Sequence, residues 1–248
     1  MSTDLIPSLP EALDMLAFAP HPDDAELYCG GTLLLNARAG RRTGIVDLTR
    51  GELSTRGDLA TREVETAEAT RLLGLACREN LGLPDGDIAN TLDHRITVVR
   101  VVRRWRPAVV LLPWPRDRHP DHEHASLLVR EALFAAGLRR IETFGDDGVA
   151  QEAFRPSRTY YYMLTEDFTP AFTVDIGAVF DDKLAAIRAY RTQFHTGEPS
   201  EGPQTYISTP DFLESLIARS RRLGFHIGAT HGEGFIPLQM LKIDAVMM

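Results

Sequence analysis

The sequence predicts an α/β protein, a three-layer sandwich in which helices cover both faces of a mostly parallel sheet. Strand-like and helix-like patterns alternate along most of the 248 residues, and such alternation is typical of parallel βαβ units with right-handed crossovers. Two short apolar runs, residues 15–19 and 109–113, each end at a cluster of histidines and aspartates. Because ligands bind at the carboxyl ends of the strands in such sheets, the clusters also predict where the site lies.

The chain up to residue 138 supplies four predicted strands and four predicted helices. The strands are short β-branched or apolar runs at residues 15–19, 43–49, the start of 78–87, and 109–113. The helices have helical spacing or helix-stop signals and cover residues 32–39, 60–73, 92–106 and 125–138. Gly40 and Gly74 stand where a helix-ending glycine is expected, and Pro107 ends the third helix.

From about Gly145 the pattern is looser and predicts a smaller C-terminal α+β portion. Its expected strands are residues 159–164, 172–176 and 232–236, and its expected helices are residues 180–194 and 212–223. The tyrosine run 160–162 could be a sugar-stacking platform, but tyrosine is common in strands and strand core is favoured. Since no linker or repeat interrupts the chain, we expect a single Rossmann-like domain over residues 1–248.

Composition and charge exclude several classes of protein. The formal net charge is −8 and no run is rich in Lys or Arg, so nucleic acid is not an expected partner. Cys29 and Cys77 are isolated and too few for a disulfide framework, which points to a reducing compartment. Neither a signal peptide nor an apolar run of the roughly 20 residues that a membrane span needs is present. We therefore expect a cytoplasmic protein that does not act at a membrane.

The first cluster follows directly after the first predicted strand. His21 and Asp24 are three residues apart in a proline-containing turn, so both side chains can converge on one point, while Asp23 between them stays free. Imidazole and carboxylate together suit zinc. The alternative is that Asp23 or Asp24 is only the N-cap of the next helix.

The second cluster, residues 117–124, follows the apolar run 109–113 and contains His119, Asp121 and His122. Alone it could be a solvated loop, but paired with the first cluster it favours a metal site. By spacing, His119 and His122 are both plausible ligands. Gly30-Gly31 invites a phosphate-loop hypothesis, yet the full glycine spacing is missing, so close packing of a helix on the sheet is favoured.

A zinc ion with three protein ligands and an open position suits the hydrolysis of an amide. It can ionise a water near neutral pH and polarise a carbonyl oxygen. A carboxylate beside the metal can accept the water proton, and an imidazolium across the site can stabilise the oxyanion and protonate the departing nitrogen. Asp23 and His119 fit these two roles.

With Ala19-Pro20-His21-Pro22-Asp23-Asp24 at one strand end and Arg118-His119-Pro120-Asp121-His122 at another, the chain resembles the PIG-L/LmbE-like zinc N-deacetylases. Segments 47–52, 80–85, 160–162, 189–194 and 233–235 resemble the bacillithiol-biosynthesis branch, which removes acetate from N-acetylglucosaminyl-malate. Pro20 and the segment Glu201–Asp211 depart from the pattern of many relatives. The second departure concerns the substrate rim.

The resemblance implies a role for each matching residue. His21, Asp24 and His122 would bind Zn²⁺, Asp23 would be the general base and His119 the general acid. Asp121 would orient His119. Arg62 matches an arginine that the family places near the acetyl group, although it could also be a helix-surface charge. The resemblance further implies a small-molecule glycoside substrate and a homo-oligomer.

The malate end of such a substrate would meet guanidinium groups, because their planar fork matches carboxylates. Arg56, in the polar loop after the second strand, and Arg118, just before His119, are the predicted rim residues, with solvated loop charges as the alternative. Two other functions stay open at this point. One is an amidase for thiol conjugates of a related sugar, and the other is a non-catalytic nucleotide-binding α/β module that uses Gly30-Gly31.

Overall fold

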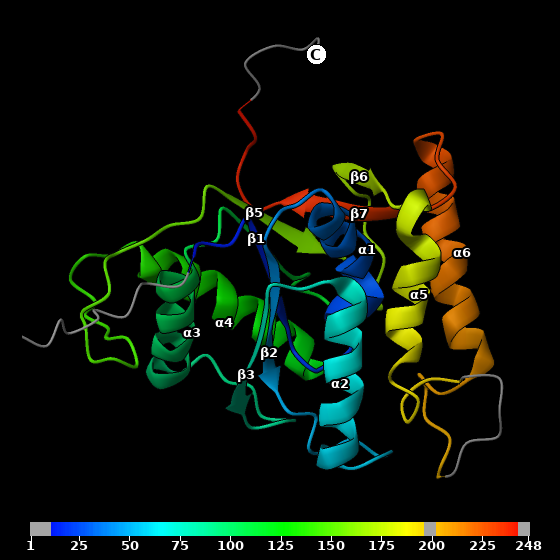
Figure 1. Ribbon diagram of the computed structural model, residues 1–248, viewed down its shortest axis with the longest axis horizontal. Helices are drawn as coiled ribbons and strands as arrows, with labels where there is room; N and C mark the ends of the chain where they lie inside the picture. Colours follow the sequence, from blue (N-terminus) through cyan, green and yellow to red (C-terminus); the bar gives the residue numbers. More distant parts are fainter. Residues whose placement is uncertain (1–10, 196–201, 243–248) are drawn as a thin grey trace, which may run out of the picture.

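The computed structural model describes residues 11–195 and 202–242, and it confirms the α/β fold (Figure 1). Within these residues, seven strands form one sheet in the order β3-β2-β1-β4-β5-β7-β6. The strands are β1 (Met15–Ala19), β2 (Thr43–Thr49), β3 (Cys77–Leu83), β4 (Val109–Pro113), β5 (Arg158–Tyr162), β6 (Phe172–Asp175) and β7 (Gly232–Pro237). The first five are parallel, whereas β7 runs antiparallel to β5 and β6. The C-terminal portion thus extends the same sheet.

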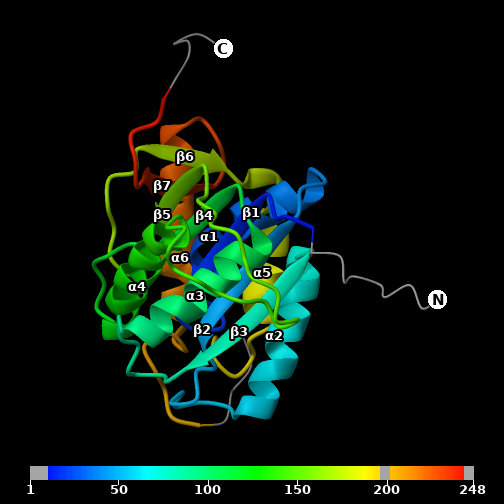
Figure 2. The same cartoon turned by 90° about the vertical axis from the view of Figure 1, so that its left-hand side faces the viewer.

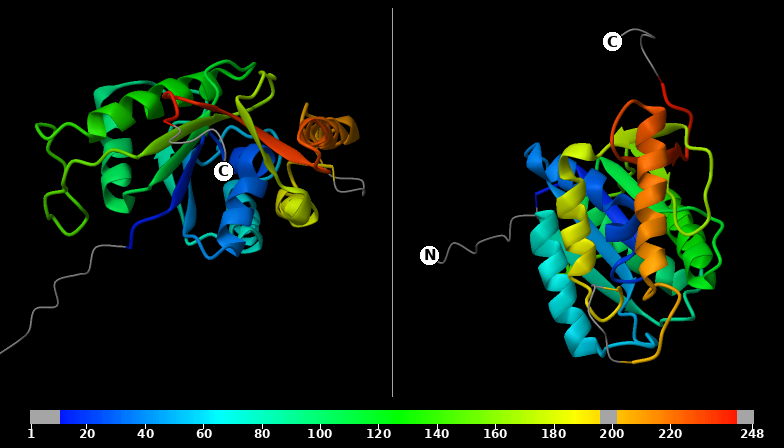
Figure 3. Two further views of the ribbon diagram at one scale, coloured as in Figure 1. Left: turned by 90° about the horizontal axis from the view of Figure 1, so that it is seen from above. Right: turned by 90° about the vertical axis from the view of Figure 1, so that its right-hand side faces the viewer.

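Helices cover both faces of this sheet (Figures 1 and 2). The helices are α1 (Asp24–Arg38), α2 (Leu59–Leu73), α3 (Leu92–Trp105), α4 (Pro120–Ala136), α5 (Phe180–Arg188) and α6 (Pro210–His226), with a 3₁₀ turn η1 (Gly177–Val179) before α5. Helices α3 and α4 lie on one face, and α1, α2, α5 and α6 lie on the other (Figure 3). No helix within the described ranges combines the length and apolarity needed to cross a membrane.

The strand order reverses between β1 and β4. Met15 pairs with Thr43 on one side and with Val109 on the other, so the chain builds β2 and β3 outward in one direction and β4 and β5 in the other. The two polar clusters follow β1 and β4, so they lie next to each other at this switch point. The loops that leave the two strands diverge there, which leaves room for a ligand between them.

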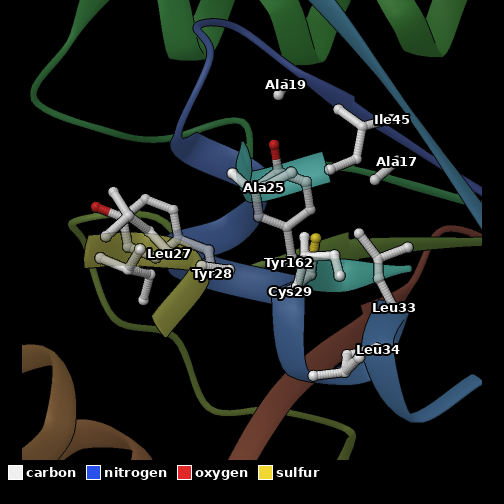
Figure 4. Packing of buried hydrophobic residues seen from close by; sticks show 14 of the residues in the cluster. Ala17, Ala19, Ala25, Leu27, Tyr28, Cys29, Leu33, Leu34, Ile45 and Tyr162 are labelled. Carbon is white, nitrogen blue, oxygen red and sulfur yellow. The ribbon is translucent and has the colours of Figure 1, made fainter. Parts of the chain in front are cut away.

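Helix α1 packs its buried side against the middle of the sheet. Figure 4 shows Cys29 and Leu33 packed near Ala17, Ile45 and Tyr162, and all five side chains are fully buried. The Tyr162 hydroxyl donates to the Phe18 carbonyl oxygen at 2.8 Å. The interpretation of the tyrosine run as strand core is confirmed at Tyr162, because a buried ring cannot stack on a sugar.

Helix α1 begins at Asp24, eight residues before the predicted start at residue 32. Gly30 and Gly31 therefore lie inside the helix, and the phosphate-loop hypothesis is wrong. The backbone N–H of Gly31 donates to Glu233 Oε1 at 2.9 Å, and a Cβ on Gly31 would lie 2.8 Å from the Ile176 side chain. Close packing is the reason for glycine at this position, as the alternative interpretation predicted.

Helices α4 and α5 also differ from the predicted ranges, by more than the few residues seen at the ends of α2, α3 and α6. Helix α4 begins at Pro120, so Asp121 and His122 form its first turn instead of a loop before it. Its N-cap is His119, whose side chain accepts the N–H of Asp121, and proline at the first position is typical of a helix start. Helix α5 ends at Arg188, and residues 189–194 continue as turns.

A buried ion pair joins α1, α5 and β7 and should contribute strongly to stability. Lys183 Nζ donates to Glu233 Oε1 at 2.7 Å, and Lys183 is 2% exposed. We expect Lys183→Met to lower the free energy of unfolding in urea by about 3 kcal/mol, because it leaves a buried carboxylate without its counter-charge. The matched control is Arg38→Met, which removes the exposed ion pair with Asp182 and should cost less than about 1 kcal/mol. Equal losses in both variants would contradict this expectation.

Candidate metal centre and active site

The turn after β1 places Asp23 in a conformation that L-residues rarely adopt, with φ 132°. Such a residue stores roughly 1–3 kcal/mol of strain and persists only where its surroundings fix it. Thr49 fixes this turn, because its backbone N–H and its hydroxyl both donate to the Pro20 carbonyl oxygen at 3.1 Å. Asp23 occupies the N-cap position of α1, but its side chain makes no capping hydrogen bond. Its carboxylate instead lines the cavity above α1.

Three of the predicted ligands converge on one point. The Asp24 Oδ2 atom lies 3.2 Å from His21 Nδ1 and 3.4 Å from His122 Nε2, and one donor atom from each residue lies within 4.8 Å of the others. Tetrahedral ligands at zinc distances of about 2.1 Å are roughly 3.4 Å apart, so the spacing fits such an ion. These three residues can therefore hold a metal.

The outer nitrogen of each imidazole faces further carboxylates. His122 Nδ1 lies 3.0 Å from Asp117 Oδ1, and His21 Nε2 lies 3.1 Å from Asp85 Oδ1 and 3.3 Å from Asp121 Oδ2. Such partners keep the proton on the outer nitrogen and direct the other lone pair inward, as in many zinc sites. With a metal bound, these contacts would favour in both rings the tautomer that the metal requires.

The charge of the cluster also favours a cation. Burial lowers the pKa of His122, but Asp24 and Asp117 outweigh burial and raise this pKa to about 9. The carboxylates thus stabilise positive charge at this point, and a metal ion would replace the proton there.

The hydrogen bonds of His119 separate it from the metal ligands. Its Nδ1 accepts the backbone N–H of Asp121 at 3.2 Å, so the neutral ring carries its proton on Nε2. Coordination through Nε2 would remove this proton and leave an anionic ring, because Nδ1 is an acceptor, whereas the Nε2–H can donate to a developing oxyanion. Burial and the neighbouring His122 and His21 lower the pKa of His119, which favours this neutral form. The spacing alone left both His119 and His122 open as ligands.

The structure gives Asp121 a different contact from the one that the resemblance implied. Its carboxylate accepts the N–H groups of Gly86 and Ile88 at 2.7 and 3.3 Å and contacts His21. Only its backbone N–H reaches His119. The carboxylate binds the loop after β3 and not His119, so Asp121 is placed to orient His21.

Arg62 lies beside Asp23 in the buried floor of the cavity. Its NH1 donates to the Pro22 carbonyl oxygen at 2.8 Å and lies 3.5 Å from Asp23 Oδ2, while NH2 donates to Ser54 Oγ at 3.0 Å. Burial raises the pKa of Asp23 to about 8, although Arg62 opposes the shift. A carboxylate with a pKa near neutrality suits a general base.

A cavity of about 420 Å³ opens over these residues. Arg118 lines it and is exposed, with its guanidinium carbon 4.2 Å from the centre of the Tyr206 ring. Arg56 does not line it. That side chain is 5% exposed and donates to the carbonyl oxygens of Thr192 and Pro203 at 2.6 and 2.9 Å. Arg56 therefore ties two loops together and is not the rim residue that its loop position predicted.

Sequence reasoning did not identify Asp117 and Asp85 as functional residues. Asp117 is the first residue of the second cluster, and Asp85 stands in the turn-rich loop after β3. Asp117 faces His122 within the same cluster, whereas Asp85 faces His21 only because the loops after β1 and β3 meet above the switch point. An acidic residue near the end of each strand was the only signal that the sequence offered for them.

The fold and the convergent His-Asp-His group define an α/β protein with a candidate metal centre. Residues 16–133 match the family described as PIG-L: GlcNAc-PI de-N-acetylase. Diacetylchitobiose deacetylase of Thermococcus kodakarensis is 32% identical over 193 residues, which span 73% of this chain and 70% of that protein. The chain therefore belongs to the PIG-L family.

Two further relatives differ in what their names describe. A probable N-acetyl-alpha-D-glucosaminyl L-malate deacetylase 2 of Bacillus anthracis is 29% identical over 196 residues, with 73% of this chain and 82% of that protein covered. The crystal structure of the conserved protein TT1542 from Thermus thermophilus superimposes with a TM-score of 0.82 at 42% identity, and the match covers 94% of this chain and 98% of that chain.

Removal of any one ligand should abolish metal binding. We expect His21→Ala, Asp24→Ala and His122→Ala each to lose bound zinc after dialysis, because two remaining ligands leave the ion under-coordinated. The control is His124→Ala, which removes an exposed histidine from the same helix as His122 and should keep full occupancy. Elemental analysis of the purified variants measures the outcome, and full occupancy in two of the three ligand variants would refute the site.

Proposed function

We propose that this protein is a zinc-dependent N-deacetylase that removes acetate from an N-acetylglucosaminide. The observation that carries the proposal is a group of three potential metal-ligating atoms around one point, with the carboxylate of Asp23, which takes no part in the helix cap, beside it. Membership of the PIG-L family and the names of the relatives support the same chemistry.

The chain's own residues supply the proton chemistry. A zinc ion held by His21, Asp24 and His122 would supply a Lewis acid and a water that ionises near neutral pH. Asp23 is placed to accept the proton of that water, since it is buried beside the ligands and its side chain is free of the helix cap. The Nε2–H of neutral His119 is available as a hydrogen-bond donor to the developing oxyanion, and the ring would protonate the departing nitrogen in its imidazolium form. Arg62 holds Asp23 in place through its contacts with the Pro22 carbonyl oxygen and Asp23 Oδ2.

The amide substitution Asp23→Asn should separate catalysis from metal binding. We expect the variant to retain its zinc and to lose at least about 100-fold in kcat, because a general base acts in the transition state and contributes little to metal affinity. Release of primary amine and zinc content are measured on the same preparation. Asp87→Asn, an exposed change outside the cavity lining, is the control. Activity of Asp23→Asn within a few-fold of the parent would mean that another group is the base.

Among N-acetylglucosaminides, we propose N-acetylglucosaminyl-malate, as in bacillithiol biosynthesis. Support comes from Arg118, whose guanidinium lies over the Tyr206 ring at the cavity rim and has no carboxylate partner among residues 11–195 and 202–242. A stacked guanidinium keeps its in-plane N–H groups free for an incoming carboxylate. The runner-up is a chitobiose-type disaccharide, for which the Thermococcus relative is the support. The cytoplasmic location and the homo-oligomer stay predictions from the sequence.

The proposed substrate is tested by comparing the effect of an Arg118 substitution on different substrates, which the overall rate alone does not reveal. For Arg118→Met we expect kcat/KM on the malate glycoside to fall about tenfold or more, equivalent to about 1.4 kcal/mol, while diacetylchitobiose and N-acetylglucosamine are unaffected. Arg116→Met, an exposed arginine two residues earlier that does not line the cavity, is the control. The same loss on all three substrates, or no loss on any, would show that Arg118 does not recognise malate.

A further inference from the structure

Arg219 of α6 holds the segment that follows β5 through three contacts. Its NH1 donates to the Leu164 carbonyl oxygen, its NH2 donates to the Thr165 carbonyl oxygen at 3.1 Å, and its Nε lies 3.0 Å from Asp167 Oδ1. Helix α6 is the outermost element of its layer (Figures 1 and 3). The side chain nevertheless is only 16% exposed, because it reaches inward toward the cavity wall.

The two peptide groups that Arg219 binds also bind Asp117 from the other side. The N–H groups of Thr165 and Glu166 donate to Asp117 Oδ2 at 2.7 and 3.3 Å. The Leu164 carbonyl and the Thr165 N–H belong to one peptide group, and the Thr165 carbonyl and the Glu166 N–H belong to the next. In a planar trans peptide the carbonyl and the N–H point in opposite directions. Arg219 therefore fixes the orientation of both N–H groups that hold Asp117.

Asp117 connects these peptides to the metal centre. Its Oδ1 atom lies 3.0 Å from His122 Nδ1 and accepts the backbone N–H of His119 at 3.0 Å. Hydrogen bonds in such a chain polarise one another, so a cation on the carbonyl oxygens strengthens the N–H groups as donors. The contacts form one path from the guanidinium of α6, through two peptides and a carboxylate, to a metal ligand.

We propose that Arg219 is a positioning residue for the metal centre, which sets metal affinity through the 164–166 peptides, Asp117 and His122. The inference rests on the proposed zinc site and adds to it a residue that touches neither metal nor substrate. Outer partners of metal-ligating histidines typically change affinity by roughly 10–100-fold.

The first experiment measures zinc affinity by competition with a chromophoric chelator. Arg219→Met keeps the apolar stem and removes the donors, and we expect it to bind zinc about tenfold more weakly than the parent. The control is Arg222→Met, from the same helix, because Arg222 pairs with the same Asp167 at 2.6 Å but with neither carbonyl oxygen. This control should leave the affinity unchanged. The visible absorption of the Co²⁺-loaded proteins provides a second readout, and it should change in Arg219→Met alone.

A double-mutant cycle tests whether the effect passes through Asp117. Asp117→Asn should weaken zinc binding about 10–100-fold, and Arg219→Met should add little to that loss, because residues on one path are not additive. Full additivity, or unchanged affinity in folded Arg219→Met, would overturn the inference. If Arg219→Met does not fold, Arg219→Lys replaces it, since a lysine retains one donor and should give an intermediate affinity.

Metal affinity separates this inference from the proposed function. Zinc binding that depends on Arg219 in a protein without deacetylase activity would support the inference and count against the function. A parent protein that binds no zinc would overturn both.

Discussion

The parallel pairing of β1 with β4 is the constraint on which the rest of the site depends. Met15 to Ala17 lie opposite Val109 to Leu111, although nearly a hundred residues separate them in the chain. Closing so long a loop costs entropy, and the pairing is stabilised because both strands are buried in the core between the helix layers. His21 and His122 meet because these two strands are neighbours. The metal centre is therefore a consequence of the hydrophobic core.

Burial of so many charges requires that each one has a partner. Asp24, Asp117 and Asp121 are buried, and each carboxylate contacts an imidazole, a backbone N–H or both. An unpaired buried charge would cost several kcal/mol. The same rule holds for Arg78, which lies between the carboxylates of Glu26 and Asp47. The loops around the centre are thus fixed by electrostatics as well as by packing.

Asp23 differs from the other carboxylates of the site, because its backbone is strained and its side chain takes no part in the helix cap. The strain is maintained by contacts from β2 and α2, through Thr49 and Arg62. Strained residues that their neighbours hold in place are typical of functional sites. The two carboxylates of one dipeptide are thereby separated into different roles, with Asp24 among the ligands and Asp23 beside them.

The sequence by itself determined the fold class, the strands that lead into the site and, through the family resemblance of its motifs, the group His21, Asp24 and His122, because apolar runs and short motifs are local features. The start of α1 could not be predicted, since Gly31 packs inside the helix against Ile176 and Glu233, which are distant in sequence. Tertiary structure alone decided that Asp85 and Asp121 face His21, that Arg56 is buried and that Arg219 and Asp117 bind the same peptide groups. Those outcomes depend on loops distant in sequence, and hydrogen-bond partners across such distances leave no local pattern in a single chain.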